Sequence, residues 1–113
     1  MKAKIIHMGH AGHFVMGSHC GYRLNTYVNG FIVSTVGELR YPSDPENGPH
    51  RPLGADPNSL YETFVFTAKK SDHKCCPYVV ADHSELEGVR YDNVDDAAEG
   101  HEKMVKKYAR KTK

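Results

Sequence analysis

Histidine and cysteine are the residues of this sequence that could bind a metal ion. The chain has 113 residues, among them eight histidines and three cysteines. Imidazole and thiolate groups are the ligands that Zn²⁺ prefers, usually four of them in a tetrahedron. Small domains with little core use such sites as structural staples. The candidate zinc ligands are His10, His13, His19, Cys20, Cys75 and Cys76.

The spacing of these candidates leaves other interpretations open. His10 and His13 have the spacing of half a zinc site, but Cys75 and Cys76 are adjacent, as His19 is to Cys20. Adjacent side chains of an extended chain point to opposite faces, so each pair would offer one ligand. One alternative is loop histidines with free thiols, and another is a catalytic site with a Cys20 nucleophile.

A second candidate site lies in the C-terminal half. His101 falls on an apolar stripe, where each imidazole nitrogen needs a hydrogen-bond partner. If a C-terminal helix docks on the predicted sheet, His101 could meet Ser34, Thr35 or Glu62 in a buried polar site.

The C-terminal end is basic. Lys106, Lys107, Arg110 and Lys111 could contact phosphates, which makes nucleic-acid binding an alternative function. Fifteen lysines and arginines against fourteen aspartates and glutamates give a formal charge of +1, so no overall positive field supports it.

The strongest local signal is a β-hairpin over residues 22–36. Asn29 and Gly30 tolerate positive φ, which a two-residue type I′ turn requires. This loop length places Thr26 opposite Val33 and puts apolar side chains on both faces of the hairpin.

The remaining elements complete a small domain. Apolar stretches predict strands within residues 2–8 and 60–68 and a short one at 78–80, and five of the six prolines fall in a long loop over residues 42–59. A helix is expected from Val94 to Tyr108, followed by a basic tail over residues 109–113. The prediction is one α+β domain over residues 1–113, with an antiparallel sheet of about three to five strands and one C-terminal helix packed on it.

Three blocks of sequence resemble a known family. They are Thr-x-Val-x-x-Phe-x-Val-Ser-Thr-Val-Gly-Glu at 26–38, Tyr-Glu-Thr-Phe-Val-Phe at 61–66 and Gly-His-Glu-Lys-Met at 100–104. Together they resemble a family of small uncharacterised proteins of tailed phages and prophages. The resemblance implies a phage gene product acting in a bacterial cytoplasm, and it implies no reaction.

The leading hypothesis for function is a small phage-encoded protein that binds and modulates a host protein, such as a defence or gene-expression factor. The expected contact surface is the sheet face that the helix leaves uncovered, together with the loop over residues 42–59. No assembled catalytic motif is evident, which favours binding over catalysis. No apolar run could span a membrane and no secretion signal is recognisable, so a cytoplasmic location is expected. No cofactor is implied other than zinc, which a binding module or a small metal-dependent enzyme would use.

Overall fold

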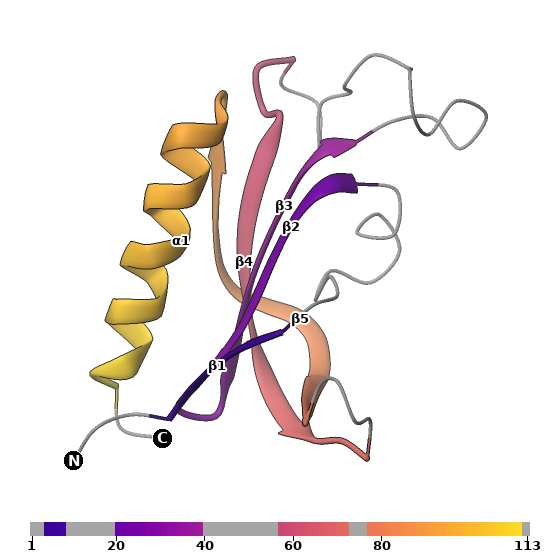
Figure 1. The fold of residues 1–113 in the computed structure, drawn as a ribbon, viewed down its shortest axis with the longest axis vertical. Helices are drawn as coiled ribbons and strands as arrows, with labels where there is room; N and C mark the ends of the chain where they lie inside the picture. Colours follow the sequence, from indigo (N-terminus) through magenta and orange to yellow (C-terminus); the bar gives the residue numbers. More distant parts are fainter. Residues whose placement is uncertain (1–3, 9–19, 40–56, 73–76, 112–113) are drawn as a thin grey trace.

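The fold is an antiparallel sheet with one helix packed against it (Figure 1). The structure, a computed structural model, describes residues 4–8, 20–39, 57–72 and 77–111. In these residues the chain forms five strands in the order β1-β2-β3-β4-β5. The α+β prediction is therefore confirmed. The elements are β1 (Ile5–Met8), β2 (Cys20–Val28), β3 (Phe31–Leu39), β4 (Tyr61–Lys70), β5 (Tyr78–Tyr91) and α1 (Val94–Ala109).

The hairpin of β2 and β3 has the predicted turn and register. Asn29 and Gly30 have φ values of 51° and 90°, as a type I′ turn requires. Thr26 lies opposite Val33, and the pairing continues to Cys20 opposite Leu39. The hairpin is thus longer than expected but in the same register, which fixes the face on which each side chain lies.

Strand β5 is the largest departure from the predicted elements, because a strand of three residues was expected and fourteen are found. Its backbone bends strongly near the middle (Figure 1). The pairing of β5 with β4 is irregular at this bend. The step from the Val65–Glu87 pair to the Thr67–Asp82 pair spans two residues of β4 but five residues of β5. Residues 84–86 and 88–90 are exposed, so this edge strand lacks the apolar alternation by which strands are recognised.

Helix α1 begins and ends with favourable groups. The Asn93 side chain accepts a hydrogen bond from the backbone N–H of Asp96 at 2.8 Å, and acidic side chains occupy the first turn while basic ones occupy the last. Most of the predicted apolar stripe is buried, but Val94 at its start is 40% exposed. The buried residues of α1 are Ala97, His101, Met104, Val105 and Tyr108.

Apolar side chains are buried on both faces of the sheet. Under the helix, the core consists of Val28, Val33 and Val65 with Met104, Val105 and Tyr108. On the opposite face a second cluster joins Met8, Tyr27, Ile32 and Phe66.

The first part of β5 bends over this opposite face. The Tyr78 ring stacks on that of Tyr27 with 3.6 Å between centroids, and Val80 packs against the same cluster. In the described residues, the centre of the face that α1 leaves uncovered is therefore buried, and the expected role of this face as a contact surface stays a prediction. Most of the proline-rich loop, residues 40–56, lies outside the described residues. No helix in the described ranges is long and apolar enough to cross a membrane.

Candidate functional site

A buried histidine joins α1 to the centre of the sheet. His101 is 2% exposed, and its ring nitrogens lie 2.7 Å from Oγ1 of Thr35 on β3 and 2.9 Å from Oγ1 of Thr26 on β2. Burial, and to a lesser degree the charge of nearby His7, lowers the pKa of His101 to about 4. The imidazole is therefore neutral near pH 7 and has one donor and one acceptor nitrogen.

The hydrogen bonds continue in both directions from His101 across the sheet. On one side, Thr35 Oγ1 lies 2.6 Å from Thr63 Oγ1, which accepts a hydrogen bond from the Tyr91 hydroxyl at 3.0 Å. On the other side, Thr26 Oγ1 lies 2.9 Å from Nδ1 of the exposed His7 on β1. These residues form the buried polar chain, which links all five strands and the helix: His7, Thr26, His101, Thr35, Thr63 and Tyr91.

One consistent arrangement of hydrogens satisfies this chain. In it, Tyr91 donates to Thr63 and the Thr63 hydroxyl donates to Thr35. Thr35 then donates to the unprotonated Nδ1 of His101, and the Nε2–H of His101 donates to Thr26. Because His101, Thr35 and Thr63 each donate once and accept once in this arrangement, the chain satisfies polar atoms that would otherwise destabilise the core. The buried polar chain therefore acts as a specific structural contact between α1 and the sheet.

The structure places one of the three predicted partners next to His101. Thr35 meets His101, but Ser34 lies on the opposite face because successive residues of a strand alternate. Glu62 also lies on that face, where its carboxylate forms an ion pair with Arg90 at 3.1 Å. Ser34 and Glu62 are therefore not part of a site with His101.

The predicted zinc ligands are not placed by this structure. His10, His13, His19, Cys75 and Cys76 lie outside the described residues, as does the side chain of Cys20. Within the described ranges, no three metal-ligating side chains come together. The zinc site therefore remains a sequence-based prediction.

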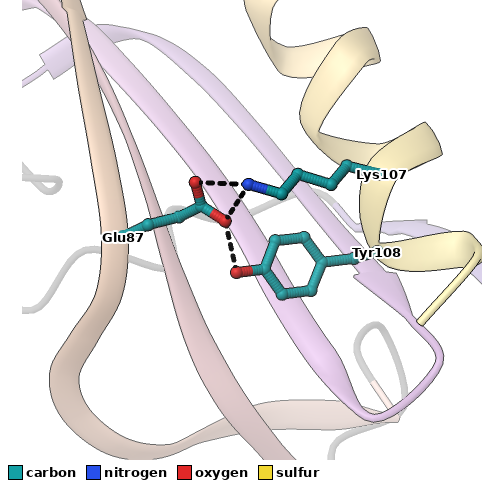
Figure 2. A network of polar contacts seen from close by, with 3 residues as sticks. All are labelled: Glu87, Lys107 and Tyr108. Atoms are coloured by element: carbon teal, nitrogen blue, oxygen red, sulfur yellow. Dashed lines mark hydrogen bonds and ion pairs between the residues drawn. The ribbon is translucent and has the colours of Figure 1, made fainter. Parts of the chain in front are cut away.

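The basic residues at the end of α1 are divided between an internal contact and the surface. Lys107 forms an ion pair with Glu87 at 2.8 Å, and the Tyr108 hydroxyl donates to the same carboxylate at 2.5 Å (Figure 2). Hydrogen bonds from Lys107 and Tyr108 lower the pKa of Glu87. Burial, and then the bond to Glu87, raise the pKa of Tyr108.

The side chain of Lys111 lies over the Tyr108 ring, with Nζ 4.8 Å from the centroid. Lys106 and Arg110 are exposed. Of the four predicted phosphate contacts, Lys107 therefore holds the end of the helix to β5, and Lys111 contacts a ring of the helix itself. Nucleic-acid binding stays a sequence-based prediction.

A groove lies between α1 and the second half of β5. It has a volume of about 470 Å³ and is lined by Glu87, Val89 and Tyr91 from β5 and by one side of α1 between Asp96 and Lys107. We call it the α1–β5 groove. In its lining, Val89 is 41% exposed, which makes it one of the few large apolar side chains at the described surface. Leu86, three residues earlier on β5 and outside the lining, is 51% exposed.

Glycine helps to shape this groove. A Cβ atom at Gly100 would lie 2.2 Å from the Tyr91 hydroxyl oxygen, so the absence of a side chain allows Tyr91 to pack against α1. Tyr91 thereby lies in the wall of the groove and also donates to Thr63 in the buried polar chain. The groove was not predicted from the sequence. The one sequence feature that could have indicated it is the short run from Val89 to Tyr91, which has strand-forming residues but no obvious strand to pair with.

Comparison with known proteins gives no relative from which to assign a function. No protein-family model, curated protein or solved structure matches this chain.

Proposed function

We propose that this protein is a small binding protein that contacts a protein partner through the α1–β5 groove and the adjoining edge of β5. The observation that carries this proposal is the exposure of Val89 on an edge strand that borders a groove. Exposed apolar side chains with polar groups at their rim are typical of protein contact sites.

The surroundings of the groove fit a contact surface. Val89 shares the lining of the groove with two ion pairs, Glu87 with Lys107 and Glu99 with Lys103. A small apolar centre with charged groups around it matches the usual anatomy of a protein interface, in which the centre excludes water and the rim supplies specificity. The fold itself leaves this surface open.

The sequence resemblance adds the kind of partner to this proposal. If the chain is a phage gene product, the partner is a bacterial host protein, and binding modulates that protein's activity. This part of the proposal depends on the resemblance in the three sequence blocks and is tested together with the surface.

The experiment is site-specific photo-crosslinking of the full chain inside bacterial cells. A photoreactive amino acid replaces Val89 or Lys103, which line the groove, or exposed Glu102 on α1 or Lys69 on β4, which do not. The expected result is one discrete host-protein adduct from Val89 and Lys103 and none from the two control positions. An adduct of equal yield from all four positions, or only from the controls, would overturn the proposed surface.

A further inference from the structure

The edge of β5 determines which form of partner fits the groove. We infer that the partner contributes an extended peptide segment, which adds to β5 as a sixth strand and places a basic and an apolar side chain in the α1–β5 groove. This inference rests on the proposed function and specifies how the same surface is used.

The backbone of β5 provides the first argument. Among the described residues, β5 is the last strand in the sheet order and pairs along one side, with β4. In an antiparallel sheet, alternate residues of such a strand direct their N–H and C=O groups outward. Residues 84–86 and 88–90 are exposed, so apart from the Ser84 N–H, which donates to the Asp82 side chain at 2.9 Å, these groups are accessible. An extended backbone is the partner that satisfies them in order, whereas a helix has none of its own free to pair.

The walls of the groove select an apolar side chain at its centre. Val89 and Tyr91 lie two residues apart and therefore on one face of β5, and Met104 of α1 lines the same groove. A side chain from a sixth strand at the level of Val89 would pack between the strand and the helix. Covering the exposed part of Val89 would stabilise the complex by removing apolar surface from water.

The charged groups that line the groove determine which second side chain of the peptide fits there. Of the charged groups lining the groove, Glu99 is paired with Lys103 at 2.9 Å and Glu87 with Lys107 at 2.8 Å. Asp96 accepts a hydrogen bond from the neutral Asn93 side chain at 3.0 Å, while Lys103, which pairs with Glu99, also feels the Asp96 charge. Three carboxylates and two lysines line the groove, so its lining is negative by one charge and complements a basic side chain, which Asp96 can accept at its end of the groove.

The alternation of side chains along a strand determines the spacing between the basic and the apolar residue of the peptide. Groove-facing positions of an added strand are two residues apart, and Tyr91 is two residues beyond Val89. Asp96 and Tyr91 line the same end of the groove, because α1 begins just after β5 ends. A strand antiparallel to β5 would run from Tyr91 toward Glu87. The peptide motif is therefore a basic residue, any residue, and then an apolar residue.

The test uses the full-length protein and a library of random seven-residue peptides displayed on a carrier. Binding peptides are expected to share the basic-x-apolar motif. N-methylation of two pairing amides in a synthetic binding peptide should weaken affinity about tenfold or more, since it removes two main-chain hydrogen bonds. Asp96→Asn should reduce the preference for a basic over a neutral residue about two- to fivefold, while Glu102→Gln on the outer side of α1 should leave it unchanged.

The outcomes separate this inference from the proposed function. Peptides that bind equally well when N-methylated, or that show no basic-x-apolar motif, would overturn strand addition. If crosslinking from Val89 still gave a discrete host protein, the surface would stand and only the form of the partner would be wrong. Absence of groove-specific crosslinks would contradict the proposed function itself.

Discussion

The Nδ1 atom of His101 lies 2.7 Å from the Oγ1 atom of Thr35, and this contact joins the only described helix to the central strand of the sheet. Both side chains are buried, with 2% and 0% of their surface exposed. Because both ring nitrogens of His101 have hydroxyl partners, the helix can dock in this position without leaving a polar atom of the imidazole unsatisfied. The polar contact thus specifies how α1 sits on an otherwise apolar surface.

Loss of the Thr35 hydroxyl should destabilise the fold. Thr35→Val keeps the shape but removes the hydrogen-bond partner of both His101 and Thr63, so we expect the free energy of unfolding to fall by about 1–3 kcal/mol. Urea denaturation measures this change. The matched control is Thr67→Val at a half-buried position of β4, where a change below about 0.5 kcal/mol is expected. Equal effects of the two substitutions would show that the buried polar chain contributes nothing specific.

Stability should fall as the pH drops from about 6.5 toward 4. The pKa of His101 is lowered to about 4 by burial and by His7, from 6.5 in an unfolded chain, so the unfolded state binds a proton that the folded state does not. The contribution of the neutral His101 to the free energy of unfolding is therefore fully present above pH 6.5. It is lost as the pH falls from 6.5 to 4, by about 3 kcal/mol in total.

The pH effect is measured as urea midpoints between pH 7.5 and 4.5. His101→Gln provides the comparison, because glutamine retains hydrogen-bonding groups but does not titrate. The variant should show a flatter dependence than the natural chain. Parallel pH profiles for the two proteins would rule out His101 as the group responsible.

The contact of Glu87 with the end of α1 should matter more than the ion pair on the helix surface. Glu87→Gln weakens the bonds to Lys107 and to the buried Tyr108, and we expect a loss of about 1 kcal/mol in urea denaturation. Glu99→Gln breaks the exposed pair with Lys103 and should leave the midpoint unchanged, because water screens that pair. The reverse order of effects would contradict the role assigned to Glu87.

Gly37 should tolerate no side chain while Tyr61 lies against it. A Cβ atom at this position would be 2.0 Å from Cδ2 of Tyr61 and 2.7 Å from Cγ, so the body of the ring blocks it. Gly37→Ala should therefore destabilise the protein by about 1–3 kcal/mol. In a Tyr61→Ala background the same change should cost much less. An unchanged cost in that background would mean that the clash is not with Tyr61.

The elements that could be predicted from the sequence are those with local signals. Asn29-Gly30 determines the hairpin by its own backbone preferences, and Asn93 marks the start of α1 through its side-chain bond to Asp96. The meeting of His101 with Thr35 was also predictable, since both lie on faces assigned by periodicity. Strand alternation would also have excluded Ser34 from that site.

The candidate binding surface could not be predicted in the same way. Strand β5 is an exposed edge, so its sequence carries no burial pattern, and its bend depends on pairing with β4. The α1–β5 groove exists only because α1 docks beside this strand, with Gly100 against Tyr91. Such a surface depends on contacts between elements, which a single sequence does not display.

The most direct test of the proposed surface is amide hydrogen exchange in the full-length protein, with and without a peptide selected from the library. We expect the outward-facing amides between Glu85 and Arg90 to exchange at least about tenfold more slowly in the complex, because pairing protects them. The amides of β1, at the opposite edge of the sheet, should be unchanged. Protection confined to β1, or to residues away from β5 and α1, would contradict the account.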